Sequence, residues 1–116
     1  MSEAYELPER LVDAHNHLHD DPDGSKMVAM MDEVHIELAL VMGSIKRSNE
    51  EVLSATRNHP DRLIGGCYLD PRDGSKAVEA VRHYYDEGLR VVKLFPNLGY
   101  FPDDETFRPF FDAIAE

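Results

Sequence analysis

Ile36-Glu37-Leu38-Ala39-Leu40-Val41-Met42 is a near-continuous apolar run of strand length. Runs of this kind are typical of parallel strands that are buried on both faces. Three further runs of similar character lie at Arg10–His15, Leu63–Leu69 and Leu89–Phe95. Successive runs start about 26 residues apart, roughly the length of one strand, one helix and their loops. The spacing predicts a chain of repeated strand–helix units.

Helical patterns occupy the segments after these runs. The expected helices are Lys26–Val34, Glu50–Asn58, Lys76–Glu87 and Thr106–Glu116. Most of them carry apolar residues at helical spacing. Ser48 and Glu51 have the spacing of a capping box before the second helix, and Gly88 is placed to end the third. Alternating strands and helices predict a parallel sheet with right-handed crossovers.

Two architectures have this pattern, an open doubly wound sheet and a (β/α)8 barrel. No G-x-G-x-x-G sequence follows the first strand, which disfavours a dinucleotide-binding fold. A complete barrel normally needs about 250 residues. We therefore expect residues 1–116 to form one partial domain of the α/β class, with the first four βα units as a parallel (βα)4 half of a TIM-type (β/α)8 barrel.

The composition, 42% hydrophobic and 30% charged, is that of a globular protein and excludes collagen, low-complexity disorder and a disulfide scaffold. A net charge of −11 argues against nucleic acid or an anionic membrane as a partner. No apolar run approaches the ~20 residues that span a bilayer. The single Cys67 and the acidic start Met1–Glu6, which lacks signal-peptide features, predict a cytoplasmic protein.

The first run ends in Asp13-Ala14-His15-Asn16-His17. Because strand side chains alternate, we expect Asp13, His15 and His17 to share one face. Two imidazoles so placed can bind one metal ion, and sites in parallel α/β folds lie at the carboxyl ends of strands. The sequence therefore predicts a divalent metal site, with zinc as the expected ion and His15 and His17 as ligands. The alternative is a polar loop whose histidines only face solvent.

Lys93 lies on the opposite face of the fourth strand from Val92 and Leu94. If Val92 and Leu94 meet the helices, Lys93 points into the mouth of the barrel. A charged lysine there is costly to bury unless it is paired or modified. Phe95 and Asn97, at the exit of the same strand, are candidate substrate-binding residues.

The Asp13–Leu18 stretch resembles the first-strand metal motif of the amidohydrolase superfamily. More narrowly, the chain is similar to the amidohydrolase 2 family, which contains aminocarboxymuconate-semialdehyde decarboxylase and related metal-dependent hydrolases and decarboxylases. Three further stretches, His59–Gly65, Leu69–Arg72 and Gly88–Asn97, resemble family segments in the same order. The last departs from the family pattern, because Arg90 replaces a small residue and Phe95 a histidine.

The resemblance implies hydrolysis of C–N or C–O bonds, or decarboxylation, of a small carboxylated or cyclic substrate. It also implies further ligands from later strands, beyond Glu116. We therefore expect the N-terminal half of an enzyme, inactive by itself, that binds metal weakly and self-associates if the chain ends here.

Three roles for Lys93 stay open. It could form a salt bridge with Asp13 or Asp70. It could bind a substrate carboxylate. As the resemblance suggests, it could also bridge two metals after carboxylation, as a fourth-strand lysine does in some superfamily members. Lys93 is therefore the candidate catalytic residue.

Two other functions fit parts of the sequence. Metal-dependent phosphoesterases of the TatD and polymerase-and-histidinol-phosphatase types also open with H-x-H. The acidic net charge does not suit a DNase, however, and Lys93 stands where the TatD pattern would place Glu. The other alternative is a non-catalytic half-barrel that acts by self-association, although a scaffold has no need of two inward histidines.

Overall fold

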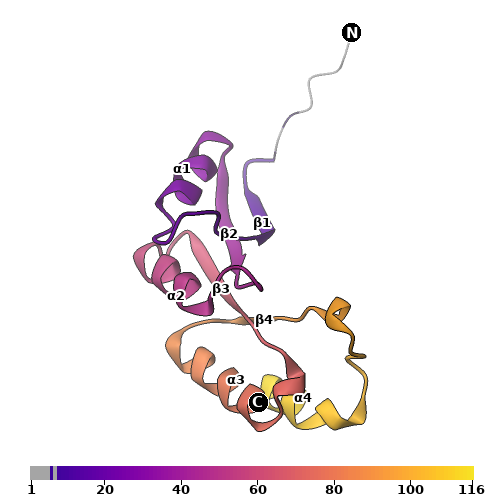
Figure 1. Ribbon diagram of the computed structural model, residues 1–116. Coiled ribbons are helices and arrows are strands. Elements are labelled where there is room, and N and C mark those ends of the chain that lie inside the picture. The colour runs from indigo at the N-terminus through magenta and orange to yellow at the C-terminus, as the bar shows by residue number, and fades with distance from the viewer. Residues whose placement is uncertain (1–5, 7) are drawn as a thin grey trace.

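The computed structural model describes residue 6 and residues 8–116. Strands and helices alternate along the chain (Figure 1): β1 Leu11–Asn16, α1 Ser25–Glu33, β2 Ile36–Met42, α2 Asn49–Asn58, β3 Leu63–Tyr68, α3 Ser75–Glu87, β4 Val91–Lys93 and α4 Arg108–Ala115. Single 3-10 turns cover Pro71–Asp73, Pro96–Leu98 and Glu105–Phe107. Most of the acidic start, residues 1–5, lies outside the described part. No helix in that part is long and apolar enough to cross a membrane.

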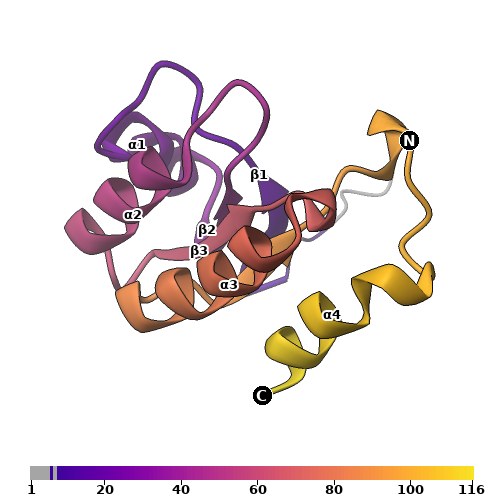
Figure 2. The ribbon, with the colours of Figure 1, turned by 60° about the horizontal axis from the view of Figure 1, so that its bottom comes forward.

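The strands form one four-stranded sheet in the order β1-β2-β3-β4, and every neighbouring pair is parallel. Each strand therefore lies beside the one that precedes it in the chain, with a helix in each connection. Figure 2 shows α1, α2 and α3 along the same side of the sheet. This confirms the predicted repetition of parallel βα units.

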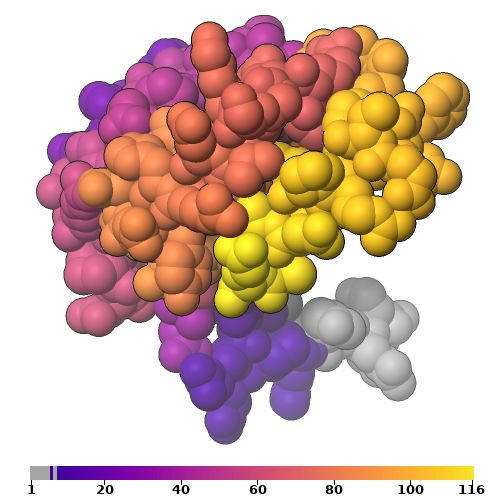
Figure 3. Space-filling model, turned by 90° about the horizontal axis from the view of Figure 1, so that it is seen from below, coloured from indigo at the N-terminus to yellow at the C-terminus, as the bar shows by residue number. Residues whose placement is uncertain are grey.

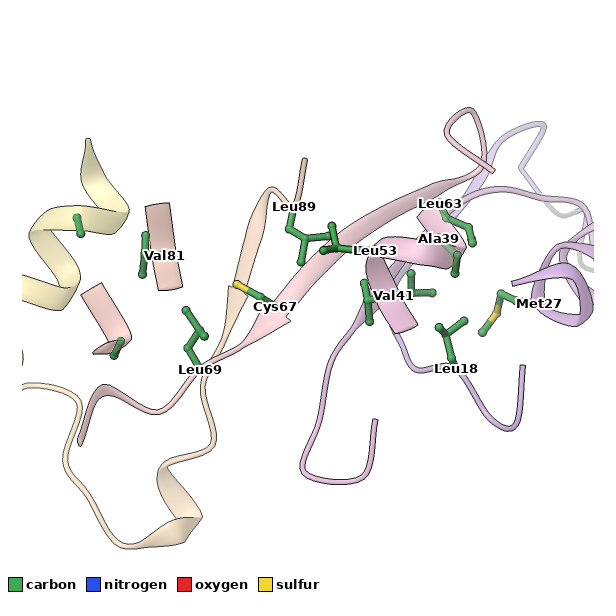
Figure 4. Packing of buried hydrophobic residues seen from close by; sticks show 14 of the residues in the cluster. Leu18, Met27, Ala39, Val41, Leu53, Leu63, Cys67, Leu69, Val81 and Leu89 are labelled. Carbon is green, nitrogen blue, oxygen red and sulfur yellow. The ribbon is translucent and has the colours of Figure 1, made fainter. Parts of the chain in front are cut away.

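The two faces of the sheet differ in burial. Ala39, Val41, Leu63 and Cys67 are all at most 3% exposed and belong to the hydrophobic core between sheet and helices (Figure 4). The opposite face is open. On it, Val12 is 60% exposed and Ile64 is 40% exposed, while Leu38 and Leu40 are half-buried. The helices thus cover one face of a curled sheet and leave uncovered the face that lines the inside of a barrel.

Local hydrogen bonds fix the helix ends. The Ser48 hydroxyl accepts from the Glu51 amide at 3.2 Å and the Glu51 carboxylate accepts from the Ser48 amide at 3.1 Å, which confirms the capping box. Gly88 ends α3 with a φ of 114°, a left-handed conformation that glycine adopts without strain. At the start of α1, the buried carboxylate of Asp21 accepts from the amides of Lys26 and Met27.

The fourth strand is shorter than the expected Leu89–Phe95. Its ladder with β3 covers only Val91–Lys93, opposite Gly66–Tyr68. The amide of Phe95 donates to the Tyr100 hydroxyl at 3.1 Å, and the chain then enters the 3-10 turn at Pro96. The local turn therefore ends the strand before its apolar pattern ends.

The last helix packs on α3 rather than on β4. Figure 3 shows the yellow surface of α4 against the orange surface of α3. Phe110 and Ala113 are the buried residues of α4. The helix begins at Arg108, because Glu105–Phe107 form a separate 3-10 turn.

Candidate metal centre

His15 and His17 converge where β1 ends. Their Nε2 atoms lie 3.3 Å apart, and their rings meet edge to face. This confirms that the two histidines point into the same space. Two nitrogens bound to one tetrahedral zinc at 2.0–2.1 Å are about 3.3–3.4 Å apart by simple geometry. The pair is therefore already spaced as two ligands of a single metal ion.

The second nitrogen of the His17 ring is held by the neighbouring strand. His17 Nδ1 lies 2.9 Å from the carbonyl oxygen of Met42, the last residue of β2. A carbonyl oxygen only accepts, so Nδ1 carries the proton and donates it. Neutral His17 then presents a bare Nε2 lone pair towards His15. Metal-binding histidines are usually oriented by such a bond from the other ring nitrogen.

Asp13 does not join the histidines, contrary to the expectation that all three share one face. The register is irregular between Asp13 and Asn16, and Asp13 pairs with Ala39, which faces the helices. The Asp13 carboxylate accepts from the His15 amide at 3.0 Å and from the Asn16 side-chain amide at 2.8 Å. These local bonds break the alternation and turn His15 and His17 together to the inner face.

The histidines open into a hollow of about 340 Å³ at the carboxyl ends of the strands. Its other walls come from the turn after β2, from the end of β3 and from β4; they are Ser44, Ile45, Lys46, Tyr68, Lys93 and Phe95. The hollow is therefore built from all four strands or the loops that follow them, at the edge where parallel α/β proteins carry their sites.

Lys93 lies where the alternation places it. Val92 and Leu94 pack against the core, and Lys93 lines the hollow with the two histidines. The salt bridge with Asp13 or Asp70, one of the three roles left open for Lys93, is not formed: Asp70 binds Arg72 at 2.7 Å, and Asp13 makes the local bonds described above. Within residues 8–116, no carboxylate lies within salt-bridge distance of Lys93.

The two candidate substrate-binding residues are separated. Phe95 lines the hollow and is 37% exposed. Asn97 lies in the 3-10 turn Pro96–Leu98, is exposed, and is not among the residues around the hollow. The structure therefore brings together His15, His17, Lys93 and Phe95, and leaves Asn97 outside.

The site brings together two histidine nitrogens, those of His15 and His17. Among the described residues, no group of three or more His, Cys, Asp or Glu side chains could hold a metal ion. The donors present fit part of a divalent-metal site.

Tyr68 is a wall of the hollow that the sequence analysis did not single out. It lies opposite Lys93 in the β3–β4 register. The side chain of Asn49 accepts from the Tyr68 amide at 2.7 Å and donates to the Tyr68 carbonyl at 2.9 Å. The sequence pattern that could have indicated Tyr68 is the alternation along β3, which places Ile64, Gly66 and Tyr68 on the open face of the sheet.

Comparison with solved structures finds the same fold in two kinds of enzyme. One is 5-carboxyvanillate decarboxylase from Novosphingobium aromaticivorans with manganese and 4-hydroxy-3-methoxy-5-nitrobenzoic acid: 23% identity over 78% of this chain and 31% of that chain, TM-score 0.69. A mutant of that enzyme, also with manganese, is 23% identical. The match covers 79% of this chain and 32% of the mutant's chain, with a TM-score of 0.70. The other is a probable 2-pyrone-4,6-dicarboxylic acid hydrolase from Acinetobacter baumannii with citric acid bound. It is 16% identical, and the match covers 90% of this chain and 45% of the hydrolase chain, with a TM-score of 0.70.

The chain spans about a third of the decarboxylase and less than half of the hydrolase. These likenesses confirm the predicted fold class, a parallel (βα)4 half of a TIM-type (β/α)8 barrel. No protein-family model matches the chain, and no curated protein matches it in sequence.

Proposed function

We propose that this chain is the metal-binding N-terminal half of a metal-dependent hydrolase or decarboxylase of the amidohydrolase superfamily, acting on a small carboxylated or cyclic substrate. The observation that carries the proposal is the 3.3 Å separation of His15 Nε2 and His17 Nε2 at the carboxyl end of β1. The likeness in fold to a decarboxylase and a probable hydrolase supports it.

In this proposal His15 and His17 are ligands of a divalent ion, and the Met42 carbonyl orients His17. When bound, the metal would polarise a substrate carbonyl or carboxylate, or lower the pKa of a water molecule. The solved decarboxylases hold manganese, so manganese stands beside zinc as a candidate ion. The remaining ligands would have to come from outside the described residues.

Calorimetric titration with Zn²⁺ and with Mn²⁺ tests the site directly. A site with two histidine ligands should bind the metal ion with a dissociation constant on the order of 1–200 μM. We expect binding at one ion per chain that is lost in His15→Ala and in His17→Ala. His83→Ala is the matched control, because His83 is exposed on α3, away from β1.

Binding that survives both substitutions, or that is lost equally in His83→Ala, would disprove the metal site. Circular dichroism of each variant separates loss of the ligand from loss of the fold.

A second candidate function, self-association as a half-barrel, is favoured by the open sheet face. Val12 and Ile64 are exposed there, and within the described sheet β1 and β4 each pair on one side only. Unpaired edges and exposed apolar faces promote association. Sedimentation velocity should show dimers or larger species for the wild-type chain and monomers for a Val12→Thr/Ile64→Thr variant. Val34→Thr is the control, because Val34 is exposed at the end of α1, and this variant should still associate.

A net charge of −11 opposes association of two copies, so added salt should increase it. A wild-type chain that stays monomeric at all salt concentrations would exclude this second function.

A further inference from the structure

One wall of the hollow stands on a loop. Phe95 lines the hollow, but it lies two residues beyond Lys93, where the ladder between β3 and β4 ends. Loops are the mobile parts of most folds, because they lack the repeated backbone bonds of strands. A loop residue therefore keeps one place in a site only where other contacts replace the ladder.

Tyr100 supplies the first of these contacts. Its hydroxyl accepts from the Phe95 amide at 3.1 Å, and the residue is only 7% exposed. Its ring meets that of Phe107 edge to face, with the centroids 5.8 Å apart. Gly99, with a φ of 105°, lets the chain turn back just before Tyr100. A buried phenol, fixed by its packing, thus holds the backbone of Phe95.

Arg72 reaches the same loop from the other strand. It lies in the 3-10 turn Pro71–Asp73, which follows β3. Its Nη1 donates to the Leu98 carbonyl at 3.2 Å, and its Cζ lies 5.3 Å from the centroid of the Tyr100 ring. A guanidinium over an aromatic face is attracted by the ring quadrupole. One side chain after β3 therefore contacts the loop after β4 at two points.

Asp70 fixes Arg72 in this orientation. The Asp70 carboxylate accepts from Nε of Arg72 at 3.0 Å, from Nη2 at 2.7 Å and from the Arg72 amide at 3.0 Å. A guanidinium bound by a carboxylate through two of its nitrogens has a defined direction. Asp70, Arg72 and Tyr100 thus form a continuous chain of contacts from the end of β3 to Phe95.

We propose that Arg72 and Tyr100 are positioning residues of the candidate site. They hold the loop after β4 against the end of β3, so that Phe95 stands in the wall of the hollow before a metal ion or ligand arrives. A wall that is already ordered lowers the cost of binding, because no loop has to be fixed at that moment. The proposal rests on the proposed function for what the hollow then binds.

Amide hydrogen exchange of the metal-free chain in EDTA, followed by NMR, tests the contact with Phe95. Tyr100→Phe keeps the ring and removes the acceptor, so the Phe95 amide should exchange roughly five- to tenfold faster, the loss expected for one net hydrogen bond. The amide of the buried Val41 in β2 should be unchanged, which shows that the fold is intact. Tyr85→Phe is the matched control, because Tyr85 is an exposed tyrosine beneath another guanidinium, that of Arg90.

Arg72→Gln tests the link between the two loops. It should speed exchange of the Leu98 and Gly99 amides, which close the 3-10 turn Pro96–Leu98 by bonds to the Phe95 and Pro96 carbonyls. Arg72→Lys keeps a charge near the Tyr100 ring but lacks the fork, so it should recover only part of the protection. Arg90→Gln, in the other pair of arginine and tyrosine, should leave these amides unchanged.

The proposal is overturned if Tyr100→Phe leaves the exchange of the Phe95 amide unchanged, or if Arg72→Gln and Arg90→Gln behave alike. Faster exchange of Val41 to the same extent as Phe95 would also overturn it, because Tyr100 would then only stabilise the whole fold.

Line broadening by Mn²⁺ connects the two residues with the site. A bound Mn²⁺ ion broadens the resonances of nearby amides, so Tyr68 and Phe95, both in the wall of the hollow, serve as reporters. Tyr100→Phe should change the broadening of Phe95 relative to that of Tyr68. The affinity for Mn²⁺ should stay the same, because Tyr100 is not among the residues that line the hollow.

The positioning role and the proposed function fail separately. A wild-type chain that does not bind Mn²⁺ would refute the proposed function, while the exchange rates in EDTA would still decide whether Tyr100 and Arg72 hold the loop. A chain that binds Mn²⁺ with the same Phe95 broadening in wild type and Tyr100→Phe would refute the positioning role alone.

Discussion

The carbonyl oxygen of Met42 lies 2.9 Å from Nδ1 of His17, so the end of β2 determines how the histidine at the end of β1 is turned. We predict that neutral His17 is the Nδ1–H tautomer. Long-range ¹H–¹⁵N correlation spectra of the metal-free chain should show this pattern for His17. The exposed His19 serves as the internal comparison. A neutral His17 protonated on Nε2 would contradict the bond.

The second prediction concerns Gly43, which leaves room for Asn49. A Cβ at Gly43 would lie 2.2 Å from Asn49 Oδ1, the atom that accepts from the Tyr68 amide. Gly43→Ala should therefore cost about 1–3 kcal/mol of unfolding free energy through overpacking. Asn49→Ala should cost about 1–3 kcal/mol, because it leaves the Tyr68 amide without its partner.

A double-mutant cycle by urea unfolding checks both effects. Gly43→Ala should cost less in the Asn49→Ala background, since the clash is with the Asn49 side chain. Asn58→Ala, at the exposed end of the same helix, should be nearly neutral. Strict additivity of Gly43→Ala and Asn49→Ala would show that the two residues do not interact.

The capping box of α2 gives a third prediction. Ser48→Ala removes the hydroxyl that accepts from the Glu51 amide and should lower the unfolding free energy by about 1 kcal/mol. Ser54→Ala makes the same change at an exposed position inside the same helix and should be neutral or slightly stabilising. Thermal or urea unfolding measures both, and equal effects would argue against the cap.

Cys67 gives a fourth prediction, based on its burial. Burial raises the pKa of the Cys67 thiol to about 11. At pH 8 roughly one thousandth of the folded chains then carries the reactive thiolate. Alkylation by iodoacetamide should be slow in the folded chain and should accelerate with urea along the unfolding curve. Equal rates in folded and unfolded chain would contradict the burial.

The same shift has a consequence for stability at alkaline pH. The folded-state pKa lies above the ordinary thiol value of 9.0, so the thiol contributes stability that is present below pH 9 and lost as the pH rises from about 9 towards 11. The unfolding free energy of Cys67→Ala should therefore fall less between pH 8 and pH 10.5 than that of the wild-type chain. Urea unfolding at the two pH values measures the difference.

A fifth prediction concerns acid. Arg72 lowers the pKa of the Asp70 carboxyl, chiefly through their side-chain hydrogen bond. A lowered folded-state pKa contributes stability that is present above the unfolded value near 4 and lost as the pH falls below it. Asp70→Asn should therefore be less stable than wild type at pH 6, with a smaller difference at pH 3. Asp86→Asn is the control, because Asp86 is exposed on α3. Its difference in stability from wild type should be the same at pH 6 and pH 3.

The sequence predicted the elements well because burial dictates their pattern. The run Ile36–Met42 is β2 itself, and the helix ends at Ser48 and Gly88 follow from side-chain and backbone chemistry that is local in sequence. The convergence of His15 and His17 was also predicted, although the alternation behind the prediction is broken between Asp13 and Asn16.

What the sequence could not predict depends on contacts between segments or on one local irregularity. Asp13 left the shared face because its carboxylate binds the His15 amide, which a strict alternation ignores. The Met42 carbonyl orients His17 although a backbone oxygen leaves no mark in a side-chain pattern. The salt bridge considered between Lys93 and Asp70 is not formed, and Arg72, two residues from Asp70, binds that carboxylate instead.

The order of the strands has a consequence for how the chain folds. Each strand pairs with the strand before it, so the sheet is built from contacts between segments about 26 residues apart rather than between the two ends of the chain. Pairing of segments about 26 residues apart costs less loop-closure entropy than pairing of the two ends of the chain would cost. During synthesis, β1 and β2 can pair before β3 leaves the ribosome, and each new strand finds its template already formed. Translation therefore delivers the strands in the order in which they lie in the sheet.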